Sequence, residues 1–71
     1  MDREYVDSSM ITSIGYDEAT CTLEVEFKNG VVWQYHDFPE YMWYEFRSAE
    51  SKGKYFHANI REQFTPLGHR V

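Results

Sequence analysis

Residues 22–36 read TLEVEFKNGVVWQYH, and this stretch decides the fold. Apolar and polar residues alternate strictly from Thr22 to Phe27, as expected for a strand with one buried face. Residues 28–30, Lys-Asn-Gly, then form a turn signal, and residues 31–36 are rich in β-branched and aromatic side chains. The stretch therefore predicts a β-hairpin.

The length of the loop sets the register of this hairpin. A two-residue Asn29-Gly30 loop would mix polar with apolar residues on each face. A three-residue loop, with Gly30 left-handed, makes one face wholly apolar, so we predict this loop and its glycine bulge. It pairs Phe27 with Val31, Val25 with Trp33, and Leu23 with Tyr35. The opposite face is expected to meet water; it carries Thr22, Glu24, Glu26, Val32, Gln34 and His36.

A first strand is predicted upstream of the hairpin, from about Met10 to Tyr16. Ile11 and Ile14 have opposite parity in this segment, so a regular strand cannot bury both on one face. Either Gly15 marks a bulge or the strand is covered on both sides.

Two helices are predicted downstream of the hairpin. The first opens at residues 37–40, with Asp37 as N-cap and Glu40 completing a capping box. Its buried side consists of Met42, Trp43, Phe46 and Ala49. The second begins at its cap, Ser51, runs to about Phe64, and buries Phe56, Ile60 and Phe64. Residues 65–71, with Pro66 and Gly68, are predicted to be a loose tail.

Together these elements predict an α+β fold, a three-stranded antiparallel β-meander followed by two helices packed on one face of the sheet. A sheet with a single apolar face needs such a cover. Seventy-one residues allow one domain at most, so we expect a single domain over residues 1–71, ordered from about 6 to 64.

The cysteine count and the hydropathy pattern indicate the compartment. Cys21 is the only cysteine, so no disulfide forms within the chain and a reducing environment is expected. Residues 1–10 are polar and lack the apolar centre of a signal peptide. No apolar run approaches the roughly 20 residues of a membrane span. We expect a cytoplasmic protein with no membrane partner.

Charge is distributed unevenly along this acidic chain, whose net charge is −5. Residues 1–46 hold ten acids and two bases, net −8, whereas residues 47–71 hold five bases and two acids, net +3. Three cations and a histidine fall within residues 51–61, SKGKYFHANIR. Such a basic segment is typical of an interaction surface; the alternative is the solvated side of a small helix.

Short motifs run in a fixed order along most of the chain. They are Ser8-Ser9, Gly15-Tyr16-Asp17, Leu23-Glu24-Val25-Glu26-Phe27, Gly30, Phe38-Pro39, Ala49, Ser51-Lys52-Gly53-Lys54-Tyr55-Phe56 and Ile60-Arg61. From about residue 6 to residue 64 the chain thereby resembles the KTSC domain family, a module at the C-terminus of some lysyl-tRNA synthetases and also a stand-alone small protein. The resemblance implies this fold and, through the synthetase association, RNA binding.

The chain departs from the family pattern at two places. The central Tyr-x-Tyr of the family stands here as Trp33-Gln34-Tyr35, and His57 replaces a small amide. Trp33 and Tyr35 are candidates for stacking RNA bases, but the predicted register sends both under the helices. We therefore assign them to the core.

The start of the second helix predicts an anion site. Free backbone N–H groups at such a start attract anions, Ser51 and Gly53 shape the turn, and Lys52 and Lys54 add positive charge. The alternative is a solvated turn whose lysines keep the surface soluble.

A basic patch is predicted along the same helix. Lys54, His57 and Arg61 are spaced at i, i+3 and i+7 and share a face. With Lys52 and Arg47 they suit weak, salt-sensitive contacts to phosphates, and Tyr55 can stack a base beside them. The alternative is an ordinary polar helix side.

Catalytic and metal motifs are not recognisable in the sequence. The three histidines have no ligand-like spacing and Cys21 lies in another element, so we expect no metal and no cofactor. The serines have no neighbouring base motif, so we expect no enzymatic activity.

These observations predict a small non-catalytic binding module for RNA, such as tRNA or another structured RNA, that acts through the second helix and its N-terminal turn. The alternative is a protein-interaction or self-association module that uses Tyr41, Tyr44 and a sheet edge. We expect a monomer, with a weak dimer as the alternative.

Overall fold

The computed structural model describes residues 3–64 and 68–70, with side chains described over residues 3–64. Its five strands form one antiparallel sheet in the order β1-β2-β3-β4-β5. The strands are β1 (Arg3–Tyr5), β2 (Ile11–Asp17), β3 (Thr22–Phe27), β4 (Val32–Tyr35) and β5 (Gly68–Arg70). The helical segments are α1 (Glu40–Ser48), α2 (Lys52–Tyr55), the π-helical turn η1 (Phe56–Ile60) and α3 (Arg61–Phe64).

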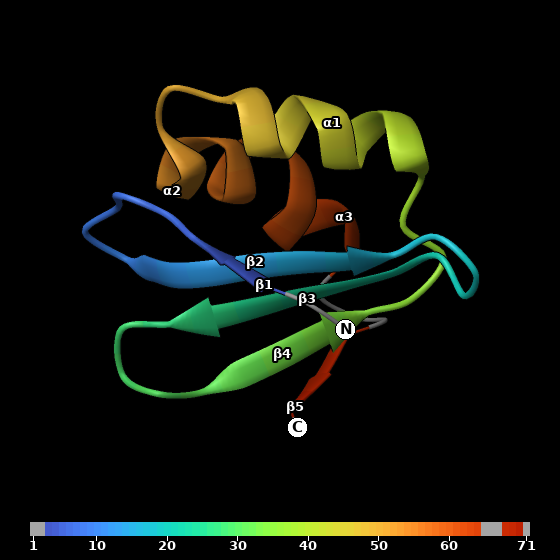
Figure 1. The fold of residues 1–71 in the computed structure, drawn as a ribbon, viewed down its shortest axis with the longest axis horizontal. Helices are drawn as coiled ribbons and strands as arrows, with labels where there is room; N and C mark the ends of the chain where they lie inside the picture. The colour runs from blue at the N-terminus through green and yellow to red at the C-terminus, as the bar shows by residue number, and fades with distance from the viewer. Residues whose placement is uncertain (1–2, 65–67, 71) are drawn as a thin grey trace.

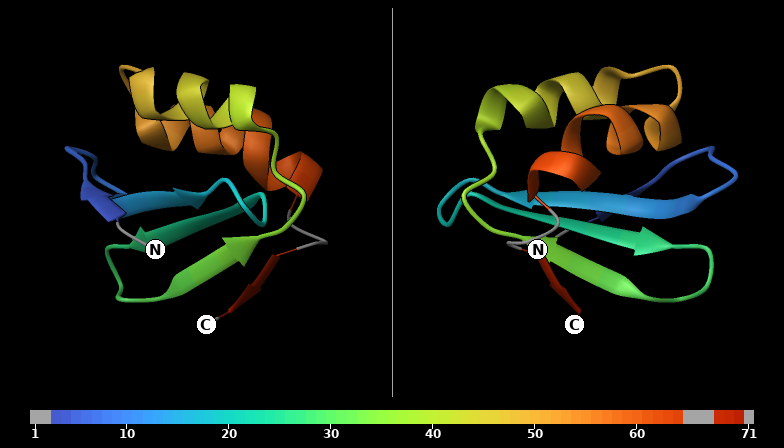
Figure 2. Two further views of the ribbon diagram at one scale, coloured as in Figure 1. Left: turned by 45° about the vertical axis from the view of Figure 1, so that its right-hand side comes forward. Right: turned by 180° about the vertical axis from the view of Figure 1, so that it is seen from behind.

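The helical segments all lie over one face of the sheet, with α1 above the layer formed by the others (Figures 1 and 2). Segments α2, η1 and α3 follow one another directly and form the predicted second helix. The α+β class, with an antiparallel sheet and two helices on one face, is therefore confirmed. The predicted number of three strands is wrong.

The central hairpin has the predicted register. Leu23 pairs with Tyr35 and Val25 with Trp33 in β3 and β4, and the Phe27 N–H donates to the Val31 carbonyl oxygen at 2.9 Å. Gly30 has a φ of 88°, the left-handed value that the three-residue loop requires. The alternation of residues 22–27 was enough to decide this register because a one-residue slip would expose the apolar set.

A bulge in β2 explains how two isoleucines of opposite parity share one face. Ile11 pairs with Phe27 and Ser13 with Glu26, so Thr12 is an extra residue in the ladder. The parity changes there, and both Ile11 and Ile14 are fully buried. A bulge was one of the two predicted explanations, but it does not lie at Gly15, which pairs regularly.

Two short strands were not predicted. Strand β1 pairs with β2, and β5 pairs with β4 through Trp33 and Arg70. Edge strands of three residues are held by backbone hydrogen bonds and are too short to show alternation in sequence. The predicted loose tail thus contains a strand at 68–70; residues 65–67 and 71 lie outside the described part of the chain.

The start of α1 differs from the prediction. The helix begins at Glu40 with Pro39 as N-cap, and no side chain caps it, so the predicted Asp37–Glu40 capping box is wrong. Asp37 instead takes a left-handed φ of 57°. This turn lets the Phe38 N–H donate to the Cys21 carbonyl oxygen at 2.9 Å and buries the Phe38 ring completely.

The core lies between the sheet and the helices. Phe56, Ile60 and Phe64 are buried as predicted. The helix makes a π-helical turn between them, in which the Arg61 N–H donates to the carbonyl oxygen of Phe56, five residues earlier. The buried apolar set is Ile11, Ile14, Leu23, Val25, Tyr35, Phe38, Met42, Phe46, Phe56, Ile60 and Phe64.

The opposite face of the sheet carries a polar network. Arg3 pairs with Glu24, with Arg3 Nε and Glu24 Oε1 3.3 Å apart, and Gln34 Nε2 donates to the same carboxylate at 2.9 Å. The buried Ser13 hydroxyl donates to Glu26 at 2.9 Å. Glu24 and Glu26 make this face acidic and unsuited to a polyanion.

Candidate functional site

The turn before α2 is built by Ser51 and Lys52. Ser51 Oγ accepts a hydrogen bond from the Lys54 backbone N–H at 3.3 Å, which confirms Ser51 as the helix cap. The Lys52 ammonium donates to the Ala49 carbonyl oxygen at 2.7 Å. It therefore satisfies an acceptor at the C-terminal, negative end of α1, where a cation is favoured. Lys52 thus joins the two helices in addition to carrying charge.

A cleft separates this turn from the connection between β1 and β2. It has a volume of about 370 Å³, and we call it the lysine cleft. Its walls are Asp7, Ser8, Ser9 and Met10 on one side and Glu50, Ser51, Lys52, Gly53, Lys54 and His57 on the other. The β1–β2 connection and α2 lie at the same end of the molecule in all the ribbon views (Figures 1 and 2).

Both walls of the lysine cleft are held by local hydrogen bonds. Ser8 Oγ accepts from the backbone N–H groups of Met10 at 3.2 Å and Ile11 at 3.3 Å. Gly53 faces this loop, since a Cβ built on it would lie 3.6 Å from Ser8 Oγ. That is an ordinary van der Waals distance, so the packing of the loop does not itself demand a glycine.

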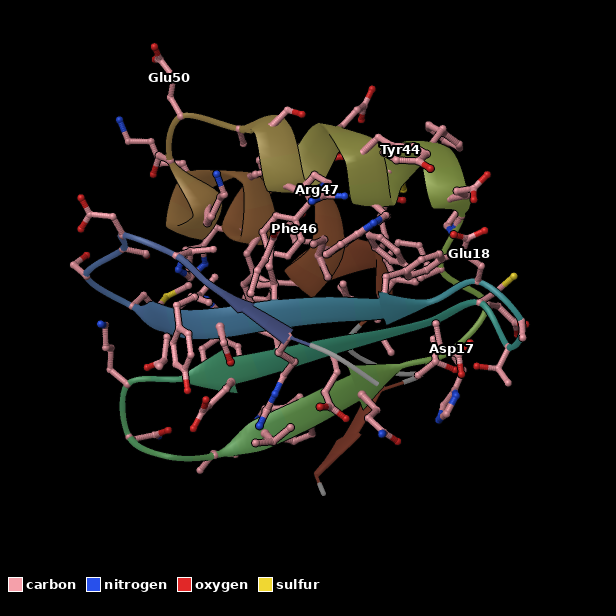
Figure 3. All side chains as sticks on the ribbon, in the orientation of Figure 1. Asp17, Glu18, Tyr44, Phe46, Arg47 and Glu50 are labelled. Atoms are coloured by element: carbon pink, nitrogen blue, oxygen red, sulfur yellow. The ribbon has the colours of Figure 1, made fainter. Side chains whose placement is uncertain are left out.

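Cations and acids share the lysine cleft. Lys54 is exposed, and no described residue forms an ion pair with it. Asp7 and Glu50 lie on the same walls, and Glu50 stands out from the turn after α1 (Figure 3). Both lysines of the cleft lie on the α2 wall together with Glu50, whereas Asp7 lies on the opposite wall, so an anionic group is best placed on the α2 side.

The predicted basic patch is divided between two hollows. Lys54 and His57 line the lysine cleft, whereas Arg61 lines a second pocket. Arg61 Nη1 lies 3.2 Å from His57 Nδ1. Because a guanidinium only donates, Nδ1 of His57 is the acceptor in this contact. Lys54 and Arg61 are thus in different hollows, and His57 contacts Arg61 across one helical turn.

Arg47 and Tyr55 lie outside the lysine cleft. Arg47 pairs with Glu4, Nη2 to Oε2 at 3.2 Å, and its guanidinium lies 5.3 Å from the centre of the Trp43 ring. It projects toward the N-terminal strand in Figure 3. The side chain is thus engaged by its own domain.

Tyr55 is packed between the helices. Its ring stacks on Phe46 with centroids 5.5 Å apart, and its hydroxyl donates to Glu45 Oε1 at 2.7 Å. Burial, followed by the bond to Glu45, raises the pKa of the Tyr55 phenol well above its ordinary value. The ring face predicted to stack a base is covered on the Phe46 side.

The second pocket was not predicted as a site. Phe27, Trp33, Tyr35, Phe56 and Arg61 enclose about 180 Å³, and we call this hollow the aromatic pocket. Tyr35 is buried, as expected for a core residue, but Trp33 is only half-buried. The register gave the correct face for both rings; it carried no information on how far the helices extend over that face.

Two kinds of functional feature, a metal-binding cluster and a membrane-spanning helix, are absent from the described residues. Over residues 3–64 and 68–70, no group of three His, Cys, Asp or Glu residues gathers in a way that would hold a metal ion. In the same part of the chain, no helix has the length and apolarity needed to cross a membrane.

Comparisons with known proteins give the same family by sequence and by structure. Residues 7–64 match the sequence profile of the KTSC domain. The chain is 38% identical over 58 residues to a lysine–tRNA ligase of Nostoc sp. (strain PCC 7120), covering 82% of this chain and 10% of the ligase. It is 33% identical over 63 residues to an uncharacterised protein of Stutzerimonas stutzeri, covering 89% of each.

A solved structure is similar over nearly the whole chain. The crystal structure of a KTSC domain protein from Yersinia pestis has a TM-score of 0.90 and 39% sequence identity, covering 99% of this chain and 96% of that one. The chain thus spans about a tenth of the ligases that it matches and most of the small relatives.

Proposed function

The chain belongs to the KTSC domain family, and on that basis we propose that it is a small non-catalytic module that binds RNA through the lysine cleft. One observation carries the proposal. Ser8-Ser9 and Ser51–Lys54, two of the motifs by which the chain resembles the family, are far apart in sequence and form the two walls of one cleft.

The charges around the cleft support an anionic ligand. Lys52 and Lys54 place two ammonium groups on its α2 wall, with Glu50 on the same wall and Asp7 opposite, in a chain whose overall charge is −5. Phosphates of RNA are the abundant anions that such a surface meets, and contacts of this kind are weak and sensitive to salt. Phosphate contacts alone position a strand and read no sequence.

The similarity to lysine–tRNA ligases supports RNA as the source of those phosphates. In these proteins the matching segment is about a tenth of the chain, attached to an enzyme whose name states that it acts on tRNA. A module in that position would lie near tRNA, and we extend this reasoning to the present chain.

Binding of fluorescently labelled RNA, followed by anisotropy at several salt concentrations, tests the proposal. We expect Lys54→Gln to weaken binding and to reduce the slope of log K against log salt by about 0.7, the loss of one phosphate contact on a single strand. Arg3→Gln is the matched control, since it removes the same charge on the opposite face of the sheet. No binding at low salt, or equal losses in the two variants, contradicts the proposal.

A protein partner is the second candidate, because two aromatic side chains of α1 face away from the sheet. Tyr41 is 65% exposed and Tyr44 51% exposed. Such rings are common anchors in protein interfaces. Sedimentation velocity over a wide concentration range tests the self-association form. A dimer that becomes a monomer in the double variant Tyr41→Ser and Tyr44→Ser would support it. A monomer at every concentration would exclude it.

A further inference from the structure

The lysine cleft is the first of three neighbouring hollows. Next to it lies a hollow of about 430 Å³, which we call the hairpin hollow, and Ser9 and Met10 line both. The hairpin hollow in turn shares Phe27 and Trp33 with the aromatic pocket. The three hollows are therefore neighbours in the order lysine cleft, hairpin hollow, aromatic pocket, and we call this row the depression. The β3–β4 turn and α2, which supply lining residues of the first two hollows, lie at the same end of the molecule (Figure 1).

We propose that this depression holds a single strand of RNA, with phosphates at the lysine cleft and one unpaired base stacked on Trp33 in the aromatic pocket. The inference rests on the proposed function and deepens it, because it specifies unpaired RNA as the ligand class. A base within a duplex is covered on both faces and cannot enter such a pocket.

The aromatic pocket has the chemistry that a base requires. Its deeper walls are Tyr35 and Phe56, whose rings meet edge to face with centroids 5.9 Å apart; Phe56 also meets Phe27 in this way at 5.3 Å. These contacts hold the rings in place. Trp33 and Phe27 are half-buried, so they are the walls that a ligand can reach. Base stacking on such an aromatic side chain contributes about 1–3 kcal/mol.

The charges in the hairpin hollow and the aromatic pocket favour a nucleotide over an apolar peptide. Among the described residues that line the hairpin hollow and the aromatic pocket there is no acid, although the chain has twelve. The charged side chains there are Lys28, on the exposed hairpin turn, and Arg61, which contacts His57. Cations beside an aromatic wall recognise an anionic chain that carries flat bases.

The two tryptophans allow a direct test. Trp43 lies on α1, stacked on Tyr16 with centroids 5.6 Å apart, and does not line the depression. In a Trp43→Phe protein, Trp33 is therefore the only tryptophan. This protein is titrated with a short RNA strand, with the same strand in a duplex, and with a strand of equal length that carries abasic positions.

We expect the single strand to quench Trp33 emission and the duplex to leave it unchanged. The abasic strand should bind about 5- to 150-fold more weakly than the intact strand, the loss of one stacked base. Because the abasic strand is offered to the same folded protein, this comparison does not depend on the stability of a Trp33 variant. Trp33→Leu, checked for folding by circular dichroism, should reduce the difference between the two strands.

Two outcomes overturn the inference, and they can be told apart. If the intact and abasic strands bind equally and Trp33 emission does not change, phosphate contacts account for all binding; the inference then fails while the proposed function stands. If no strand binds at low salt, the proposed function fails and the inference fails with it.

Discussion

At the scale of single residues, the charged side chains near α2 have unequal freedom to meet a ligand. Lys52 donates to the end of α1, Arg47 pairs with Glu4, and His57 accepts from Arg61. Lys54 differs, because its side chain is exposed and forms no ion pair among the described residues. A partner that needs a cation at the lysine cleft would therefore depend most on Lys54.

The Ser51 cap gives a prediction about stability. Ser51→Ala removes the acceptor of the Lys54 backbone N–H at the start of α2 and should lower the free energy of unfolding by about 1 kcal/mol. Urea denaturation followed by circular dichroism measures this. Ser48→Ala, at the exposed last residue of α1, is the matched control and should cost much less. Equal losses in both variants would show that the cap contributes nothing.

At the scale of elements, the hairpin and the helix start use their glycines differently. Gly30 adopts a φ of 88° that only glycine takes without strain. Gly53 has no such angle, and its place in the lysine cleft leaves room for a methyl group beside Ser8. The first glycine is thus required by the backbone, and the second is not.

Paired glycine substitutions test this difference. Gly30→Ala should lower the free energy of unfolding by about 1–2 kcal/mol, the cost of a left-handed alanine. Gly53→Ala should leave stability unchanged or raise it by up to about 1 kcal/mol, because alanine favours the helix. Thermal and urea unfolding of the two variants provide the comparison. A larger loss for Gly53→Ala than for Gly30→Ala would refute it.

The same elements show how far the sequence determines the fold. Strict alternation over Thr22–Phe27 fixed the hairpin, and the spacing of Phe56, Ile60 and Phe64 fixed the buried side of the second helix. The capping box at Asp37 failed because tertiary contacts of Phe38 outweighed a local preference. Strands β1 and β5 depend on backbone pairing with distant partners, which no local pattern encodes.

The candidate site was predictable only in part. The basic character of residues 51–61 and the Ser51 cap were visible in sequence, but the opposite wall, Asp7–Met10, was not, since only the fold brings it beside α2. The half-buried state of Trp33 depends on how far the second helix extends over the sheet. The alternation of apolar and polar residues shows on which face of a strand a side chain lies, but it does not show how exposed that side chain is.

At the scale of the whole molecule, most of the aromatic rings lie in one core or pack against it. Burial raises the pKa of Tyr35 to about 12. Burial, followed by a contact with Cys21, raises the pKa of Tyr16 to about 12 as well. The Tyr16 hydroxyl donates to the Phe38 carbonyl oxygen at 2.6 Å, so its neutral form is also needed for a hydrogen bond.

This packing predicts alkaline destabilisation. Above about pH 10 the unfolded chain loses its tyrosine protons while the folded chain keeps them, so the free energy of unfolding should fall as the pH rises from about 10 to about 12. Urea titrations at several pH values measure this fall. Tyr35→Phe removes one titrating group and should make the fall less steep. An unchanged slope would mean that Tyr35 ionises equally in both states.

The central claim is that the lysine cleft is where this domain meets RNA. A nuclear magnetic resonance titration of the isotope-labelled protein with a short single-stranded RNA at low salt tests it most directly. We predict that the amide shifts gather at Ser8, Ser9, Lys52–Lys54 and His57, and that Lys54→Gln greatly weakens them. Shifts centred on Tyr41 and Tyr44, or no shifts at all, would contradict the claim.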